Sequence, residues 1–254
     1  MFLFQVPPPT RYDLRFSLFG ISVRVHPLFW VISFVFGLSA GSFLNILLWM
    51  VAVFIAILVH ELGHALAFRW YSLRSSIVMH SMGGLTVPES VSWGSGWANN
   101  ALRPREEIII SLAGPVSGFI FAVLIAFAMI ISGGTVVINW FLGFIPLPVL
   151  ISIPFGSMIL GPLVNDLFWI CVFWGMINLV PVYPLDGGNI ARNAWTQYDP
   201  YDGVRKSLWL SVIAGGVVVL VAVIFLRSSF MVLLFGFLAF QSYQILQATY
   251  GGRW

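Results

Sequence analysis

Charged side chains are scarce in this sequence. Asp, Glu, Lys and Arg make up only 8% of its 254 residues, whereas 59% of the residues are hydrophobic. A soluble domain is about one quarter charged, so this composition excludes an ordinary soluble globular protein and predicts an integral membrane protein. The apolar runs are long and unbroken, unlike the roughly ten-residue alternating segments of an outer-membrane barrel, and they therefore predict helices.

Cysteine is nearly absent as well. The single residue, Cys171, excludes an internal disulfide and any cysteine-based metal site. The net charge is +3, but the arginines are scattered over predicted loops. Membrane orientation explains that distribution better than nucleic-acid binding does, so we expect no nucleic-acid partner.

Six apolar windows predict an all-α polytopic membrane protein with about six transmembrane helices. One helix over residues 27–59 would be about 50 Å long, against a hydrocarbon core of roughly 30 Å. A break near 37–42 resolves this by making two spans. The predicted spans are 27–42, 44–68, 107–131, 164–183, 208–226 and 229–248. We expect one membrane-embedded domain over 1–254, without an appended soluble domain.

The basic residues predict the orientation of these spans. With six spans, eleven of the 12 lysines and arginines fall on one side of the membrane, and Arg227 alone falls on the other. The positive-inside rule then predicts that both termini are cytoplasmic, in a membrane of the bacterial cytoplasmic type.

Two kinds of segment do not fit a spanning helix. Residues 135–163 are apolar and uncharged but contain four prolines, and a crossing there would move Arg192, Arg205 and Lys206 to the outer side. We therefore predict an interfacial or re-entrant segment on the outer side. Residues 16–25 and 77–87 are β-rich, with Gly20 and the pair Gly83 and Gly84 as turn signals, and predict a small membrane-associated β element.

The most informative motif is His-Glu-Leu-Gly-His at 60–64, inside an uncharged apolar run. On a helix, His60 and His64 share one face at i and i+4, where both imidazoles reach one zinc ion. Glu61 lies beside them as the candidate general base toward zinc-activated water. Ionisable groups within a span are costly, which favours a catalytic role.

A catalytic zinc site needs a third protein ligand, and Asp186 is the best candidate. Glu61 and Asp186 are the two acidic residues set deep in apolar sequence on the cytoplasmic side of a span. Prolines and glycines flank Asp186, as expected for unwound backbone that turns a side chain toward a neighbour. Asn178 precedes it by about two helical turns and is a candidate donor to a substrate carbonyl.

These motifs resemble those of the site-2 protease family of intramembrane zinc metalloproteases. His-Glu-Leu-Gly-His at 60–64 is similar to the first family motif, and Asn-Leu-Val-Pro at 178–181, continuing through Pro-Leu-Asp-Gly-Gly at 184–188, to the second. With weaker echoes, the resemblance covers about 16–190. It implies one zinc ion per chain bound by His60, His64 and Asp186, with Glu61 as base and Asn178 at the substrate carbonyl.

The resulting hypothesis is a zinc endopeptidase that cleaves transmembrane segments of membrane-protein substrates near the cytoplasmic face. The alternative is a metal-binding membrane transporter that uses the same His, Glu and Asp cluster. Such a transporter needs a polar path across the bilayer, and the outer halves of the predicted spans offer almost no polar residues. The expected partners are the lipid bilayer and a transmembrane substrate, whose identity the sequence does not give; nor does it give the oligomeric state.

Overall fold

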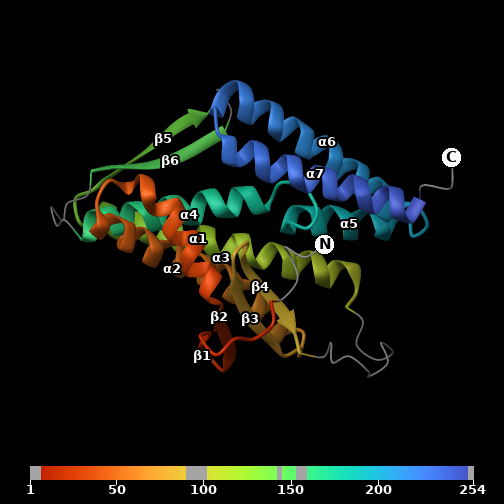
Figure 1. Cartoon of the computed structure of the whole chain (residues 1–254), viewed down its shortest axis with the longest axis horizontal. Helices are drawn as coiled ribbons and strands as arrows, with labels where there is room; N and C mark the ends of the chain where they lie inside the picture. The colour runs from red at the N-terminus through yellow and green to blue at the C-terminus, as the bar shows by residue number, and fades with distance from the viewer. Residues whose placement is uncertain (1–6, 90–101, 142–144, 153–158, 251–254) are drawn as a thin grey trace. The chain divides into compact units, whose positions relative to one another are not determined.

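The structure is a computed structural model that describes residues 7–89, 102–141, 145–152 and 159–250. It divides into two compact units, one formed by 2–90 with 116–175 and the other by 91–115 with 176–254. The element order begins with two strands, a short helix, a long helix and two more strands. One helix, a pair of strands and the remaining helices follow (Figure 1). The single-domain organisation of the chain stays a prediction.

The first unit contains a four-stranded sheet in the order β1-β2-β3-β4. Its strands are β1 (Leu14–Leu18), β2 (Ile21–Val25), β3 (Ser75–His80) and β4 (Gly83–Pro88). Neighbouring strands β1 and β2 are antiparallel, β2 and β3 parallel, and β3 and β4 antiparallel. The two β-rich segments predicted from the sequence are therefore confirmed, and β1 and β4 form the edges of one sheet.

The glycine signals at these strands have different explanations. Gly20 has a φ of 76° and closes the turn between β1 and β2, as predicted. Gly83 and Gly84, by contrast, are the first residues of β4, and the turn itself is made by Ser81 and Met82. The turn prediction was thus wrong by two residues. Gly83 is required by its φ of 112° and by the Trp174 ring, which a Cβ would approach to 2.8 Å.

The crossover between β2 and β3 is helical. Helix α1 (Pro27–Gly37) and the 3-10 turn η1 (Leu38–Ala40) precede α2 (Phe43–Trp70). Gly41 has a φ of 82°, and the Ser42 hydroxyl accepts the Asn45 N–H at 3.2 Å to cap α2. The predicted break near 37–42 is confirmed, because a left-handed residue and an N-cap start a new helix there.

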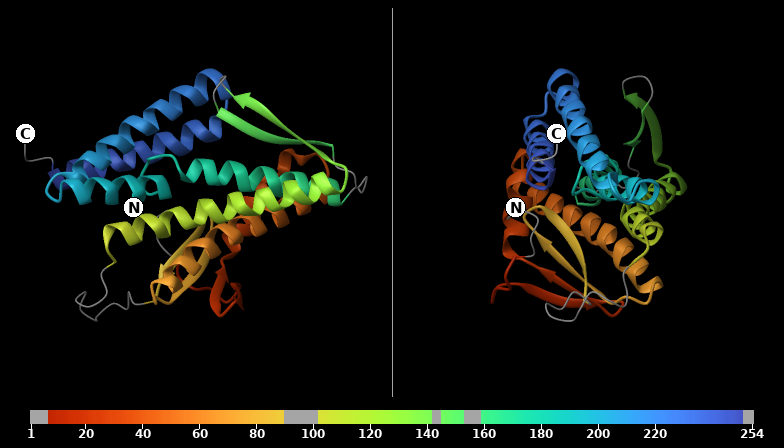
Figure 2. Two further views of the ribbon diagram at one scale, coloured as in Figure 1. Left: turned by 180° about the vertical axis from the view of Figure 1, so that it is seen from behind. Right: turned by 90° about the vertical axis from the view of Figure 1, so that its right-hand side faces the viewer.

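The sheet packs against α2 (Figure 2). Val23 and Val25 of β2 and Ile77 and Met79 of β3 are fully buried. They form one apolar cluster with residues of α1 and α2, including Phe29, Ile57, Leu58 and Ala65. At the end of α2, Arg69 donates to the Phe19 carbonyl at 2.7 Å. The part of α2 that carries 60–64 is thereby fixed on the sheet.

Five helices are long and apolar enough to cross a membrane in the part of the chain that the structure describes. They are α2, α3 (Pro104–Ile131), α4 (Leu160–Asn178), α6 (Gly203–Val221) with the π-helical turn η2 (Ala222–Leu226), and α7 (Ser229–Tyr250). The first predicted span, 27–42, corresponds to α1 and η1, a shorter apolar helix over Pro27–Ala40. At 1.5 Å per residue it is about 20 Å long, less than the hydrocarbon core.

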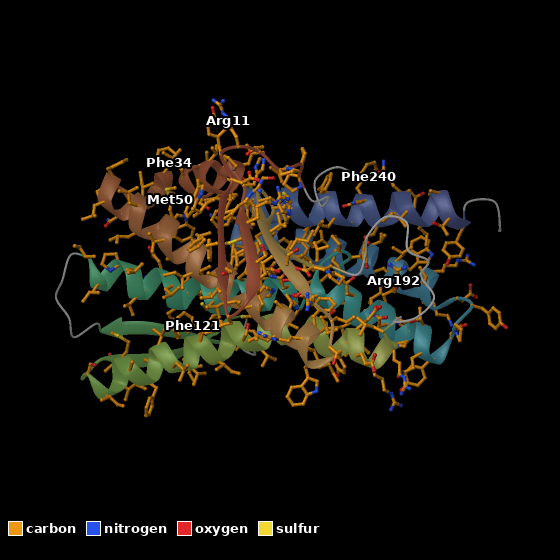
Figure 3. The ribbon with its side chains drawn as sticks, turned by 90° about the horizontal axis from the view of Figure 1, so that it is seen from below. Arg11, Phe34, Met50, Phe121, Arg192 and Phe240 are labelled. Carbon is orange, nitrogen blue, oxygen red and sulfur yellow. The ribbon has the colours of Figure 1, made fainter. Side chains whose placement is uncertain are left out.

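Large apolar side chains cover the outside of these helices. Phe34 of α1 and Phe240 of α7 are 37% and 57% exposed and project outward (Figure 3). A soluble monomer rarely exposes apolar patches larger than a few hundred Å². Exposed apolar residues along each candidate span therefore support the prediction of an integral membrane protein.

The described residues of 135–163 contain no helix that spans this segment. Strands β5 (Thr135–Phe141) and β6 (Ile145–Ser152) pair as an antiparallel hairpin, and α4 begins at Leu160. Pro146 and Pro148 are two residues apart in β6, so both missing N–H groups lie on one side of that strand. The interfacial or re-entrant placement of this segment stays a prediction.

In the second unit, α6 and α7 pack side by side, and α5 (Asp186–Tyr198) packs against α6 (Figure 1). The loop between α4 and α5 is held from both long helices. The Ser211 hydroxyl of α6 accepts the Tyr183 N–H at 3.1 Å, and the Ser242 hydroxyl of α7 donates to the Tyr183 carbonyl at 3.4 Å. Two buried serines thus fix the main chain three residues before Asp186.

The orientation of the spans is testable by cysteine labelling in a Cys171-free background. We expect positions 95 and 198 to be labelled from the cytoplasmic side and position 143 from the other side, because the basic loops are predicted to be cytoplasmic. Tyr198 is highly exposed, whereas positions 95 and 143 lie outside the described residues. A cytoplasmic signal from position 143 would contradict the predicted topology.

Candidate metal centre

His60 and His64 lie one turn apart on α2 and are both buried. Their Nε2 atoms are 3.2 Å apart, and their rings meet edge to face with centroids 4.9 Å apart. Two zinc–nitrogen bonds of 2.0–2.1 Å at a tetrahedral angle separate the nitrogens by about 3.3 Å. The pair therefore has the spacing of two ligands of one tetrahedral zinc ion.

Glu61 follows His60 directly and is 5% exposed. Its carboxylate lies against β4 within the same unit. The Thr86 hydroxyl is 2.7 Å from Glu61 Oε2 and 3.1 Å from the Glu61 carbonyl oxygen. A Cβ at Gly84 would come within 2.3 Å of Glu61 Cγ. The sheet predicted from the β-rich segments therefore fixes the candidate base.

Asp186 is the first residue of α5, and α4 ends earlier than predicted, at Asn178 instead of near residue 183. Residues 179–185 form the connection between the two helices. The Asn189 N–H donates to the Leu185 carbonyl at 3.0 Å, so a new helix starts at Asp186. The irregular backbone predicted around Asp186 is therefore found before this residue, at 179–185, whereas the residues after Asp186 are helical.

The glycines after Asp186 are required by close backbone packing. A Cβ at Gly187 would lie 2.2 Å from the Leu179 carbonyl oxygen, and one at Gly188 would lie 2.4 Å from the Tyr183 nitrogen. Real Cβ atoms do not approach backbone so closely, so α5 is folded tightly back onto its own connection. This packing and the two serines together determine where the first residue of α5 lies.

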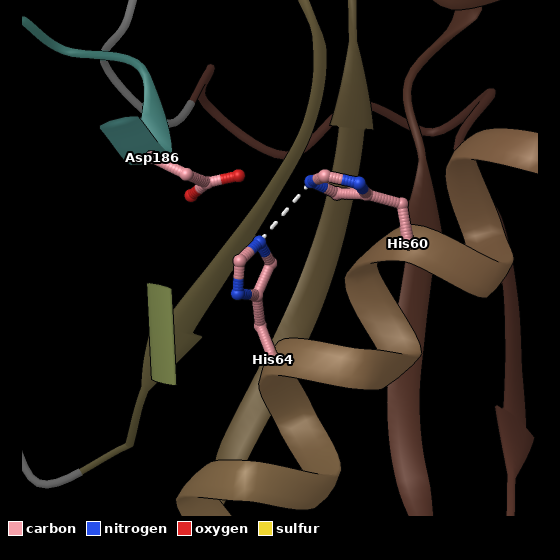
Figure 4. Close-up of side chains that lie close together, drawn as sticks. All are labelled: His60, His64 and Asp186. Atoms are coloured by element: carbon pink, nitrogen blue, oxygen red, sulfur yellow. Dashed lines mark hydrogen bonds between the residues drawn. The ribbon is translucent and has the colours of Figure 1, made fainter. Parts of the chain in front are cut away.

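Asp186 stays the predicted third ligand. Figure 4 shows the imidazoles of His60 and His64, which extend from successive turns of α2. Two imidazole nitrogens and one carboxylate oxygen are a donor set of catalytic zinc sites, which keep a fourth position open. The residues present therefore fit zinc.

Asn178 is the last residue of α4 and is buried. Its predicted role at a substrate carbonyl stays a prediction.

The two remaining histidines lie at the sheet. His26 and His80 are both buried, and the Nδ1 atom of each accepts a backbone N–H, from Leu28 at 3.2 Å and from Met82 at 3.4 Å. Burial lowers the pKa of His80, and the nearby His26 and Arg24 lower it further. Both rings therefore accept structural hydrogen bonds, His26 at the N-cap of α1 and His80 at the end of β3.

Sequence reasoning missed Thr86, Gly84, Ser211 and Ser242. Gly84 was noted as a turn signal and as part of a weaker family resemblance, not as a contact of Glu61. No motif marks a threonine or serine whose partner lies 25, 28 or 59 residues away in the chain. Small and polar residues in otherwise apolar segments were the one available signal.

The chain is similar in sequence to known proteins. The sequence model of peptidase family M50 matches residues 48–223. A curated zinc metalloprotease from Methanocaldococcus jannaschii is 26% identical over 190 residues, which cover 72% of this chain and 45% of that protein. This chain thus matches less than half the length of that relative.

The fold is also found among solved structures. A site-2 protease from Methanocaldococcus jannaschii matches with a TM-score of 0.56 and 20% identity, over 92% of this chain and 95% of that one. At this identity the match establishes the fold alone. It confirms the predicted class, a helical membrane protein with a small sheet.

Proposed function

Because the chain belongs to peptidase family M50, we propose that this integral membrane protein is a zinc metalloprotease that cleaves transmembrane segments of other membrane proteins. The observation that carries the proposal is the pair His60 and His64, with Nε2 atoms 3.2 Å apart and Glu61 between them, on a helix apolar enough to span a membrane.

Each polar residue of the proposed site has its own role in peptide-bond hydrolysis. His60, His64 and Asp186 would hold one zinc ion per chain, and the ion, when bound, supplies Lewis acidity and lowers the pKa of water. Glu61 accepts a proton from the attacking water and returns it to the amine that leaves when the peptide bond breaks. Asn178 donates its side-chain N–H to the carbonyl oxygen as negative charge develops there.

A substrate that is itself a transmembrane helix hides its carbonyls in hydrogen bonds, so cleavage requires local unwinding. The unwound backbone then needs new partners, which an edge strand provides by β-augmentation. Edge strand β4 carries the residues that contact Glu61, and is therefore better suited than β1 to hold a substrate near the base.

The pairing pattern identifies the main-chain groups of β4 that face outward. The Glu89 N–H donates to the Arg74 carbonyl at 2.8 Å in the register of β3 and β4. Since hydrogen-bonded and non-hydrogen-bonded pairs alternate in an antiparallel ladder, Gly84 and Thr86 direct their main-chain groups away from β3. Gly84 and Thr86 are therefore the positions of β4 that we propose pair with the unwound substrate, since β3 is an interior strand.

The edge-strand role is tested by comparing Thr86→Pro with Thr86→Val. Both variants lose the hydroxyl, but proline also removes the outward N–H. We expect kcat/KM of the proline variant to fall at least about tenfold below that of the valine variant, with expression and zinc content kept, because an edge position tolerates proline. Equal activity of the two variants would exclude substrate pairing at this N–H.

The class of function is tested in liposomes that contain the purified protein, a single-span reporter and an enclosed zinc-sensitive dye. A protease cuts the reporter, loses activity with a zinc chelator and regains it with added zinc. The transporter alternative instead predicts zinc entry with an intact reporter.

We also infer cleavage near the cytoplasmic face, cytoplasmic termini and a bacterial-type cytoplasmic membrane, as the distribution of arginines supports.

A further inference from the structure

The carboxylate of Glu61 has a specific partner outside its own helix. The Thr86 hydroxyl, on β4, lies 2.7 Å from Glu61 Oε2 and 3.1 Å from the Glu61 main-chain oxygen. The hydroxyl has one proton, and the shorter contact is to the carboxylate. A hydroxyl donating to a carboxylate forms a charge-assisted hydrogen bond, which is stronger than one to a neutral carbonyl.

Gly84 confines the same side chain from the next position on that face of β4. A Cβ there would lie 2.3 Å from Glu61 Cγ, 2.5 Å from Oε1 and 2.6 Å from Cδ. The absent Cβ therefore leaves the space that the carboxylate fills. Gly83, one residue earlier, packs against the Trp174 ring, so the start of β4 is itself held in place. The Thr86 hydroxyl and the bare backbone of Gly84 therefore confine the Glu61 side chain from the side of β4.

A glutamate on a helix has three rotatable side-chain bonds, and its carboxylate samples several rotamers unless something holds it. A base contributes fully only when it is aligned with the proton that it takes. A misplacement of about 1 Å costs on the order of 100-fold in rate. One hydrogen bond from a rigid strand removes this freedom, and sites with such support are more precise than unsupported ones.

We propose that Thr86 is a positioning residue for Glu61, which holds the carboxylate in its reactive orientation through its hydroxyl, while Gly84 keeps the space for it. This inference rests on the proposed function, in which Glu61 is the base. It places two tasks on one strand, since the main-chain groups of Thr86 face away from β3 and its side chain contacts the base.

The proposal is tested with purified Thr86→Val, Thr86→Ser and, as a matched control, Val87→Thr, which changes the neighbouring residue on the other face of β4. Valine keeps the shape and β-branching of threonine without the hydroxyl. With a single-span reporter, kcat of Thr86→Val is expected to fall about 10- to 100-fold, while KM stays within about twofold. Serine restores most of kcat, and Val87→Thr matches the wild type. Zinc content and thermal stability are measured for all of them and are expected to be unchanged.

Three results would overturn the proposal. The first is a kcat of Thr86→Val within twofold of wild type. The second is a raised KM with unchanged kcat, which would mean that the hydroxyl contacts substrate. The third is a loss of stability or zinc that accounts for the loss of rate, which would make Thr86 an anchor between β4 and α2. A wild-type protein that never cuts the reporter contradicts the proposed function instead, so the two failures are distinguishable.

Discussion

Glu61→Gln is expected to bind zinc like the wild type and to lose at least about 10²- to 10⁴-fold in cleavage rate. Loss of a general base typically costs that much. Glutamine keeps the size of the side chain. Its amide oxygen can accept the hydrogen bond of the Thr86 hydroxyl, which in the wild type lies 2.7 Å from Glu61 Oε2. The fold and the contact with β4 therefore survive, and only the basic oxygen is lost.

The measurement is cleavage of the single-span reporter, with zinc content and melting temperature determined on the same preparation. A Glu61→Gln protein that cleaves at the wild-type rate would show that another group accepts the proton. A variant that has also lost zinc would be uninformative for catalysis, and Glu61→Asp, which keeps the carboxylate on a shorter chain, then separates basicity from metal binding.

Asp186→Ala is expected to lower zinc affinity by more than about 100-fold. Mutating a residue that only supports a metal ligand already lowers metal affinity about 10- to 100-fold. Asp202→Ala is a suitable control, since Asp202 is an exposed carboxylate in the same unit at the start of α6, without a side-chain capping bond. The measurement is zinc per chain after dialysis against a competing chelator. Unchanged zinc affinity in Asp186→Ala would remove this residue from the ligand set.

Much of the fold was predictable from the sequence because the bilayer imposes simple rules. Helix length and apolarity identified the long spans, and the excessive length of a single helix over 27–59 identified the break before α2. The i and i+4 spacing of His60 and His64 predicts a shared helical face, and their Nε2 separation of 3.2 Å fulfils it. Local patterns sufficed wherever a local interaction decides the structure.

The remainder depends on contacts between residues far apart in the chain. Helix α5 begins at Asp186 because Gly187 and Gly188 pack against the preceding connection, and an apolar window does not detect this helix because its sequence is largely polar. Strands β5 and β6 pair with each other although β6 contains prolines, which hydropathy does not encode. Thr86 acquires its role only when β4 is placed against α2.

The most direct test of the central claim is the position of the cut. Purified zinc-loaded protein is incubated in liposomes with a reporter that has one transmembrane segment, and the fragments are identified by mass spectrometry. The proposed function predicts new termini within the hydrophobic segment for the wild type, and none after zinc chelation or with Glu61→Gln. An intact reporter, cuts only in its soluble parts, or the same cuts with Glu61→Gln would contradict an intramembrane zinc protease built on His60, Glu61 and His64.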